Sequence, residues 1–286
     1  MTLLETRAPA KINVCLYLGP TREDGRHELV SVMQSVSLTD RVRLEHAAER
    51  DEVVCPGVDG ENLVGTAIAR FRAQTGWDGD PVRISIKKRI PVAAGMAGGS
   101  ADAAAALRLL GRASGREDPD LLTAIAEGLG SDVPAQVLPG RVLATGAGER
   151  LERVPGVARY AVLVVPAGRP LATPDVYREA DRLGLGRDHA GLEQALQIVR
   201  AGLPDLADPL CVNELEPAAL SLCPELAETL DAVRGAGADV AMVSGSGPTV
   251  LGLFHDPDAG EAAVQRFPGA VVTRPVGPHA GEVLAS

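Results

Sequence analysis

A glycine-rich segment in the first half of the chain could bind an anion. It runs from Gly95 to Asp102, has glycines at 95, 98 and 99, and precedes an alanine- and leucine-rich run that is expected to be a helix. Glycine has no Cβ, so the backbone can turn sharply and approach a ligand closely. Ser100 stands where that helix would begin, and the first N–H groups of a helix lack partners and lie at the positive end of its dipole. The segment therefore predicts a site for nucleotide phosphates, with a simple glycine-rich turn capped by Ser100 as the alternative.

The spacing of these glycines disfavours two familiar nucleotide-binding folds. A P-loop needs a lysine beside its hydroxyl residue, and none stands beside Ser100. A dinucleotide-binding loop needs the pattern GxGxxG, which the glycines at 95, 98 and 99 do not follow.

A second segment of small residues, Ser244–Pro248, lies between two apolar runs. Residues without bulky side chains let a loop come close to another backbone or to a ligand. The segment is therefore interpreted either as a loop that approaches the glycine-rich segment or the substrate, or as a flexible connection between two strands.

The beginning of the chain predicts a strand with two polar residues on one face. Apolar residues recur at every second position from Ile12 to Leu18, a period of two. If these residues face the core, Lys11 and Asn13 face either a cleft or solvent. Only three of the 28 basic residues are lysines, so a lysine at position 11 suggests a need for its compact charge.

Asp132 is a candidate catalytic carboxylate. It follows a predicted helix that ends in the glycine-containing segment 128–130, and it precedes Val133 and Pro134. Its carboxylate could orient or deprotonate a substrate hydroxyl. The alternative is that Asp132 caps the short segment that begins at Val133.

Periodicity and capping signals predict the elements that carry these residues. Asn62 is a possible cap of one helix, and Asp118 followed by Pro119 predicts the start of another. Glycine and proline become dense over 140–156, which places a domain boundary near 155. The tail after Pro275 is expected to be loosely held. Strands are expected at about 12–18, 29–36, 41–45, 82–86, 160–165, 239–243, 249–254 and 270–274, and helices at about 62–73, 101–110, 119–127, 192–201, 211–221 and 224–234.

The composition is that of an ordinary globular protein with about two domains. The chain has 286 residues, of which 45% are hydrophobic and 23% are charged. Its net charge of −10 and its aromatic content of 2% disfavour nucleic-acid binding, which draws on basic residues and on base stacking. No apolar run of about 18 residues predicts a membrane span, and no signal peptide is evident.

The cysteines indicate neither a disulfide framework nor a zinc site. Cys15, Cys55, Cys211 and Cys223 are widely spaced and form no CxxC pair. Cysteines of this kind are typical of a reducing compartment, so the cytoplasm is the expected location. The sequence shows no dedicated metal-binding cluster.

Three of these segments together resemble the three motifs of the GHMP small-molecule kinases. They are Pro9–Asn13, Pro91–Ala101 and Ser244–Thr249. Within that superfamily, Lys11–Asn13 followed by Asp24–Leu29 resembles the branch that phosphorylates a cytidyl alcohol of the non-mevalonate isoprenoid pathway. The order and spacing of the motifs fit from about residue 6 to residue 254, nearly the whole chain.

The resemblance implies an α+β, two-domain GHMP kinase fold. A ribosomal-S5-like N-terminal domain would span residues 1–155 and hold ATP, and a ferredoxin-like C-terminal domain would span residues 156–286. ATP and the substrate would meet in the cleft between them. ATP chemistry implies Mg²⁺ as a cofactor. The partner would be the small cytidyl alcohol, with no nucleic acid and no membrane, and the chain would be a monomer or a homodimer.

The resemblance also implies a role for each matching residue. Gly130–Pro134 is similar to the catalytic aspartate segment of that branch, so Lys11 and Asp132 would be catalytic. The substrate would contact Asn13, Arg26, His27, Thr173 and Tyr177. The ATP site would comprise Pro91, Val92, Ala93, Ala94, Gly95, Met96, Ala97, Gly98, Gly99, Ser100 and Ala101.

The chain departs from the family pattern at several positions. The family's loop is Gly-Leu-Gly-Gly-Gly-Ser-Ser, and here Ala97 and Ala101 stand in place of a glycine and a serine. The tyrosine that stacks on cytosine in the family is Arg26 here, whose planar guanidinium can also stack on a ring. Tyr177 matches the aromatic residue on the other side of the base, and His27 is expected to contact the base edge.

Two alternative functions stay open. The first is another kinase of the superfamily that acts on homoserine, mevalonate or a sugar, against which Asp24–Leu29 and Tyr177 argue. The second is a nucleotide-binding regulator on the same scaffold without turnover. The joint presence of Lys11 and Asp132 argues against it.

Overall fold

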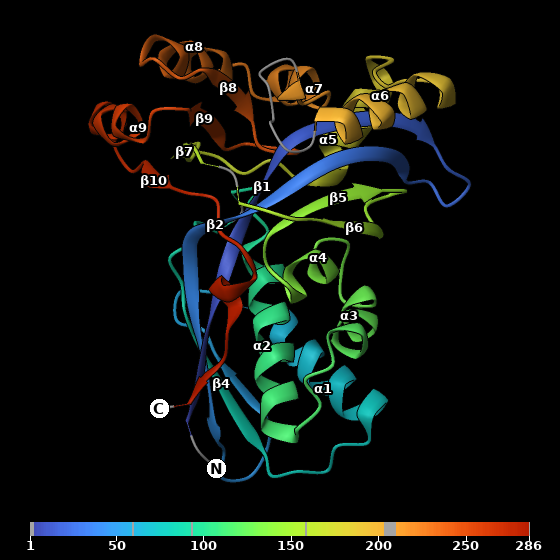
Figure 1. The fold of residues 1–286 in the computed structure, drawn as a ribbon, viewed down its shortest axis with the longest axis vertical. Helices are drawn as coiled ribbons and strands as arrows, with labels where there is room; N and C mark the ends of the chain where they lie inside the picture. Colours follow the sequence, from blue (N-terminus) through green and yellow to red (C-terminus); the bar gives the residue numbers. More distant parts are fainter. Residues whose placement is uncertain (1–2, 59, 93, 158, 203–209, 286) are drawn as a thin grey trace.

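The computed structural model describes residues 3–58, 60–92, 94–157, 159–202 and 210–285, which contain two β-sheets covered by helices (Figure 1). The strands of the larger sheet are β1 (Leu4–Thr21), β2 (His27–His46), β3 (Glu52–Val54), β4 (Val82–Lys87), β5 (Arg141–Thr145), β6 (Arg150–Val154) and β11 (Leu284–Ala285). Those of the smaller sheet are β7 (Ala161–Val165), β8 (Val240–Val243), β9 (Val250–Phe254) and β10 (Val271–Thr273). The helices are α1 (Leu63–Thr75), α2 (Gly98–Ser114), α3 (Pro119–Glu127), α4 (Val133–Val137), α5 (Thr173–Arg182), α6 (His189–Gly202), α7 (Glu216–Leu222), α8 (Leu226–Gly235) and α9 (Pro257–Ala263), with 3-10 helices η2 (Val264–Arg266) and η3 (Pro278–Gly281).

Two long antiparallel strands, β1 and β2, form the spine of the larger sheet. The two separate strands predicted over 29–36 and 41–45 are one continuous strand, β2, because its length allows it to pair with β1, β4 and β5 in turn. The ladder between β1 and β2 shifts register between Pro9 and Lys11 and again between Asn13 and Cys15. Bulges of this kind re-aim side chains, and here they flank the two polar residues of the predicted site.

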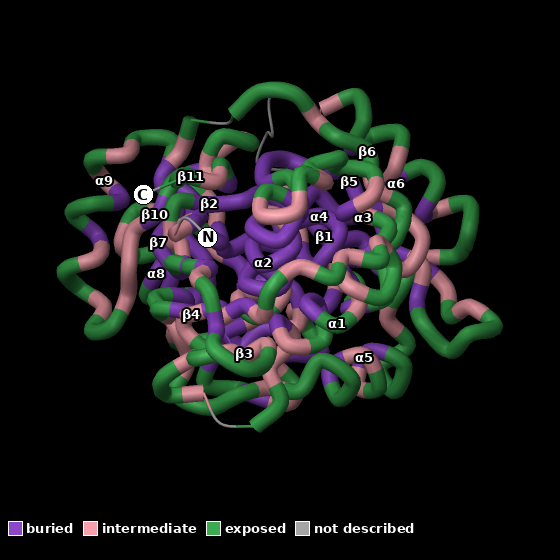
Figure 2. The backbone as a smooth tube through the Cα atoms, turned by 90° about the horizontal axis from the view of Figure 1, so that it is seen from below, coloured by how far each residue is buried: buried purple, intermediate pink, exposed green. Residues whose placement is uncertain are grey.

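Helix α2 lies in the buried centre of the molecule (Figure 2). Its alanines at 103–106 are fully buried, and side chains this small let the helix pack closely on β1, β2, α1 and α4. The helix ends at Gly115, which adopts the left-handed conformation typical of a C-terminal cap. Packing along its length therefore holds the helix start at Gly98 in a fixed position. No helix in the described ranges has the length and apolar content that crossing a membrane requires.

Two predicted caps are confirmed. The side chain of Asn62 accepts a hydrogen bond from the Val64 N–H at the start of α1. The side chain of Asp118 accepts one from the Asp120 N–H at the start of α3. Such caps satisfy backbone donors that have no partner inside the helix.

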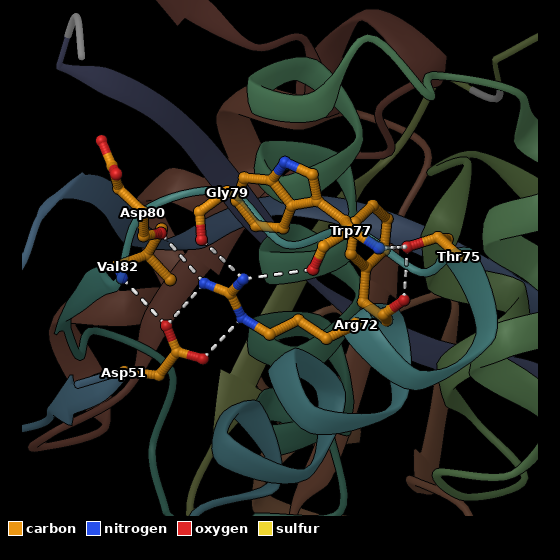
Figure 3. Close-up of polar contacts among 8 residues, drawn as sticks. Asp51, Arg72, Thr75, Trp77, Gly79, Asp80 and Val82 are labelled. Atoms are coloured by element: carbon orange, nitrogen blue, oxygen red, sulfur yellow. Dashed lines mark hydrogen bonds and ion pairs between the residues drawn. The ribbon is translucent and has the colours of Figure 1, made fainter.

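The end of α1 is tied to the start of β4 by Arg72 (Figure 3). Its Nε and Nη2 donate to the Asp51 carboxylate at 2.7 and 2.8 Å, and the remaining donors reach backbone carbonyls of Trp77, Gly79 and Asp80. Asp51 also accepts the N–H of Val82, the first residue of β4. Because β4 is the strand that precedes the glycine-rich segment, this network anchors the chain on one side of that segment.

The smaller sheet has its own hydrophobic cluster, to which α5, α7, α8 and α9 contribute. Leu16 and Leu18 of β1 belong to this second cluster, while Ile12 and Val14 belong to the cluster of the larger sheet. One strand therefore runs through both cores. The strands up to Val154 lie in one sheet and β7 begins the other, and the domain boundary near 155 stays a prediction.

The carboxyl tail is not loosely held, as the sequence suggested, but returns to the larger sheet. Residues of β11 pair with Leu4 and Glu5 of β1, which places the two ends of the chain side by side (Figure 1). The Thr6 hydroxyl lies 2.9 Å from the carbonyls of both Gly281 and Glu282. The strand that makes this pairing has only two residues, which is too short for an alternating pattern to reveal it.

Candidate active site

A cavity of about 640 Å³ collects the predicted site residues from both halves of the molecule. Its lining includes Lys11 and Asp132, the predicted catalytic pair, and two residues of the glycine-rich segment, Gly95 and Ala97. All the residues predicted to contact the substrate also line it: Asn13, Arg26, His27, Thr173 and Tyr177. Residues more than a hundred positions apart therefore share one cleft.

Lys11 and Asp132 meet at the centre of this cleft. The Lys11 Nζ lies 3.5 Å from Asp132 Oδ2, and it donates a hydrogen bond of 2.8 Å to Asn13 Oδ1. Asn13 in turn donates to the Ser31 hydroxyl at 2.7 Å, so the lysine and the asparagine are both held. Lys11 is buried and the Asp132 side chain is 30% exposed. The sequence left open whether Lys11 faces solvent, and the structure places it in the cleft.

Asp132 occupies the cap position of α4, but its side chain makes no capping hydrogen bond. Its carboxylate instead faces Lys11. Of the two interpretations made from sequence, the structure supports a carboxylate that is available to a ligand rather than one that is used to cap a helix.

The glycine-rich segment forms the start of α2 beside Lys11. The Lys11 N–H donates to the Met96 carbonyl at 3.1 Å, which joins β1 to the segment. Ala97 has a φ of 54°, and the helix begins at Gly98, two residues before Ser100. The N–H groups of Gly98, Gly99 and Ser100 have no acceptor within the helix, because the first turn lacks preceding carbonyls. They form the predicted donor set for phosphate oxygens.

Two residues of the predicted ATP site are not part of this donor set. Ala101 is completely buried and its N–H donates to the Ala97 carbonyl inside the helix. Ala93 lies outside the described residues. A second cavity, of about 370 Å³, adjoins the segment and is lined by Pro91, Val92, Ala94, Met96, Gly98 and Gly99 among others. Gly95 and Ala97 line both cavities. The segment therefore lies where a long ligand could extend from one cavity into the other.

The segment Ser244–Pro248 connects β8 to β9 and also touches the glycine-rich segment, which is the close approach that the first interpretation expected. A Cβ on Gly95 would lie 2.7 Å from the Gly247 carbonyl oxygen, and Gly95 has a φ of 69°. Asn213, which sequence reasoning missed, donates to the carbonyls of Val243 and Gly245 at 2.8 Å each. The two hydrogens of its amide nitrogen make both bonds, and the pattern around Asn213 gave no signal of this role.

An aromatic pair forms another part of the cleft wall. The ring centroids of His27 and Tyr177 are 5.5 Å apart, and the ring planes are tilted by 37°. Burial raises the pKa of Tyr177 to about 12, and the Asp132 carboxylate acts in the same direction. Arg26 donates to the Asp24 carboxylate in its own turn at 2.8 Å. The proposed stacking of its guanidinium on a base stays a prediction.

Thr173 and Ser246 face each other across the cleft, with their hydroxyl oxygens 2.8 Å apart. Thr173 begins α5 and Ser246 belongs to the segment between β8 and β9. This contact joins the predicted substrate residue to the second small-residue segment.

A cluster of three charged residues links the chain before the glycine-rich segment to the helix that begins in it. Lys88 Nζ lies 2.5 Å from Asp40 Oδ2 and 2.8 Å from Asp102 Oδ2. Asp40 also accepts the N–H groups of Arg89 and Ile90, so it holds the chain that enters the segment, while Asp102 lies in the helix that leaves it. Burial raises the pKa of Asp102 to about 7 against the opposing effect of Lys88.

The sequence matches two family models, which are described as the GHMP kinases N terminal domain, over residues 62–140, and the GHMP kinases C terminal domain, over residues 191–272. A 4-diphosphocytidyl-2-C-methyl-D-erythritol kinase from Streptomyces coelicolor is 44% identical over 264 residues, which cover 87% of each chain. One from an Anaeromyxobacter species is 40% identical and covers 96% of this chain and 89% of its own.

Solved structures of related kinases superpose on this chain. The crystal structure of a 4-(cytidine 5'-diphospho)-2C-methyl-D-erythritol kinase superposes with a TM-score of 0.81 at 34% identity and covers 96% of this chain and 100% of its own. Homoserine kinase from Cytophaga hutchinsonii superposes with a TM-score of 0.76 at 18% identity and covers 99% and 98%. The second likeness concerns the fold alone.

The contact between the two small-residue segments predicts a difference between two glycines. Gly95→Ala is expected to lower the free energy of unfolding by about 1–3 kcal/mol, because the methyl group would meet the Gly247 carbonyl and the positive φ would be strained. Gly99→Ala is the matched control, since a Cβ at position 99 would point into open space and the φ of Gly99 is not positive. Urea unfolding measures both variants, and equal stabilities would contradict the close contact.

The raised pKa of Asp102 predicts a pH-dependent stability. A carboxyl whose pKa is higher in the folded state contributes stability that is fully present below its ordinary value of 3.8 and is lost as the pH rises through about 7. Asp102→Asn lacks this titration, so its unfolding free energy relative to the wild type should increase between pH 4 and pH 7. Urea unfolding at several pH values measures the difference, with the exposed Asp78→Asn as a control. A constant difference over that range would contradict the prediction.

Proposed function

The chain belongs to the GHMP kinase family, and from this premise we propose that it transfers the γ-phosphoryl group of ATP to the 2-hydroxyl of 4-diphosphocytidyl-2-C-methyl-D-erythritol. This alcohol is an intermediate of the non-mevalonate isoprenoid pathway. The observation that carries the proposal is the contact between Lys11 and Asp132 in a cleft that also holds the His27 and Tyr177 rings. The relatives with this activity in their names match over most of the chain.

Asp132 is proposed to act on the substrate hydroxyl. Phosphoryl transfer passes through a loose transition state, so catalysis depends on positioning and on electrostatic stabilisation. A carboxylate that is free of capping bonds can orient the hydroxyl and accept its proton. Because its side chain is partly exposed to the cleft, it is accessible to a bound alcohol.

Lys11 is proposed to stabilise the negative charge that moves between ATP and the alcohol. Its ammonium is buried, close to Asp132 and held by Asn13, so its position requires little reorganisation during the reaction. A fixed positive charge of this kind stabilises the negative charge that develops on the attacking oxygen and on the transferring phosphoryl group.

The start of α2 is proposed to hold the phosphates of ATP, the donor that GHMP kinases use. The N–H groups of Gly98, Gly99 and Ser100 would cradle the phosphate oxygens. Within the part of the chain that the structure describes, no group of three or more acidic, histidine or cysteine residues could hold a metal ion. Mg²⁺ commonly binds through substrate phosphates and water with few protein ligands. Mg²⁺ would accordingly be held mainly by the phosphates of ATP, with the Ser100 hydroxyl as a proposed neighbour, and it would neutralise phosphate charge.

The cytidyl end of the substrate is proposed to lie against Tyr177, near His27 and Thr173, all of which line the cleft. An aromatic ring that stays neutral offers a stacking face to a base. The cytoplasm remains the proposed location, supported by four free cysteines.

A comparison of substrates tests this function directly. With ATP and Mg²⁺, the protein should phosphorylate the cytidyl alcohol far faster than homoserine, mevalonate or a sugar. Preference for one of those would favour the alternative kinase. Absence of any product from ATP would favour the non-catalytic regulator.

The proposed role of Asp132 predicts a specific kinetic defect. Asp132→Asn should reduce turnover by at least about a hundredfold, because an amide cannot accept the hydroxyl proton. The dissociation constant of ATP should change little, since Asp132 does not form the phosphate cradle. Steady-state kinetics and equilibrium nucleotide binding measure the two quantities, and near-normal turnover would remove Asp132 from the mechanism.

A further inference from the structure

Arg108 is a charged residue in the apolar part of α2. Its neighbours Leu107 and Leu109 are completely buried, and Arg108 is itself half-buried. Its guanidinium lies against the carboxyl tail, where a Cβ added to Gly281 would lie only 3.1 Å from the Arg108 Cζ. A charged group that gives up contact with water needs hydrogen-bond partners. The partners of this guanidinium therefore indicate what it does.

The guanidinium joins α2 to two other elements of the site. Nη1 donates to the carbonyls of Gln136 and Val137, at 2.7 and 3.3 Å, and Nη2 donates to the Arg7 carbonyl at 2.8 Å. Gln136 and Val137 end α4, and Arg7 lies on β1. A guanidinium carries its five donors in a fixed plane, so one side chain can bond two elements at a set separation.

Helix α4 depends on such contacts because it is too short to be stable by itself. It has five residues, all of them buried, and its last carbonyls have no N–H partners within the helix. Arg108 supplies donors to two of those carbonyls. Arg153 of β6 donates to the carbonyls of Ala135 and Leu138 at the same end. Of these two arginines, Arg108 is the one that also bonds β1.

The two elements that Arg108 bonds carry the proposed catalytic groups. Asp132 is the cap residue of α4 and makes no capping bond with its side chain, so its position follows that of the helix. Lys11 lies four positions after Arg7 on β1. Helix α4 and β1 are thus held together by Arg108 at the far end of α4, and at its near end the Lys11 Nζ lies 3.5 Å from Asp132 Oδ2.

We propose that Arg108 is a positioning residue, which fixes Asp132 relative to Lys11 by bonding the helix that carries one to the strand that carries the other. The inference rests on the proposed role of Asp132 in phosphoryl transfer. Arg108 donates to backbone carbonyls, so it acts on the reaction only through the position of the carboxylate. A displacement of about 1 Å in a catalytic group can cost about a hundredfold in rate, so a small movement of α4 is enough.

The first test removes the donors of Arg108 and keeps an apolar stem. Arg108→Met should lower kcat by between about tenfold and a hundredfold, because α4 can then move relative to β1. The dissociation constant of ATP should stay within about twofold of the wild-type value, since the phosphate cradle at the start of α2 is unchanged. Arg112→Met is the matched control, because Arg112 lies one turn later on α2, is exposed and pairs with Glu117. Its kcat should equal that of the wild type.

A double variant separates positioning from general structural damage. In an Asp132→Asn background there is no carboxylate for Arg108 to position, so Arg108→Met should lower kcat by less than about twofold further. A merely structural defect would lower kcat equally in both backgrounds. That result overturns the inference, and so does an unchanged kcat in Arg108→Met alone. Each kcat is divided by the concentration of ATP-binding sites, which removes the contribution of unfolded protein.

Arg108→Lys takes the place of Arg108→Met if that variant does not fold. A single ammonium nitrogen lacks the planar fork that bonds α4 and β1 together, so kcat should also fall, and full activity would overturn the inference.

The same series separates this inference from the proposed function. Near-normal turnover in Asp132→Asn would contradict the proposed role of Asp132 and the inference with it. A large loss in Asp132→Asn beside an unaffected Arg108→Met would contradict only the role of Arg108.

Discussion

The site depends on keeping an ammonium group buried in a cleft. A buried charge is costly unless it is paired and hydrogen-bonded, and Lys11 has both a carboxylate partner and an amide acceptor. The bulges in β1 aim Lys11 and Asn13 at this point, and the second core anchors the strand beyond them. The position of Lys11 therefore depends on β1, the strand whose apolar residues pack in both hydrophobic clusters.

Close backbone approach is the second requirement. The glycine-rich segment lies against β1 and against the segment Ser244–Pro248. Its residues also line two cavities. Side chains larger than hydrogen at Gly95 would separate these backbones, so the small residues serve packing between segments as well as any ligand. The ionic triad of Lys88, Asp40 and Asp102 holds the chain on both sides of the segment, which limits how far it can shift.

The two halves of the molecule contribute different parts of the cleft. The larger sheet and α2 supply the charged pair and the backbone donors, while α5 and the segment between β8 and β9 supply Tyr177, Asp181 and Ser246. Contacts such as His27 with Asp181 and Thr173 with Ser246 join these parts. A substrate long enough to span the cleft would touch both halves, which is the arrangement that the proposed function needs.

Local signals in the sequence determined much of this. Capping residues identified the starts of α1 and α3, alternation identified β1 and β4, and the glycine spacing marked the start of α2 to within two residues. The motif resemblance implied the family and named some of the residues that line the cleft. The caps, the alternation and the glycine spacing depend on residues within a turn or two of one another, where backbone geometry and side-chain period suffice.

Other features were decided only by tertiary structure. The sequence could not tell whether Asp132 caps a helix or faces Lys11, or whether Lys11 is buried. It also could not show that Asp181 contacts His27 or that Asn213 binds the carbonyls of Val243 and Gly245. It also gave no sign that the carboxyl tail returns to β1. Each of these depends on a contact between residues far apart in the chain. Such contacts arise when hydrophobic faces pack in three dimensions, and no local pattern of polar residues encodes which partner the packing will bring.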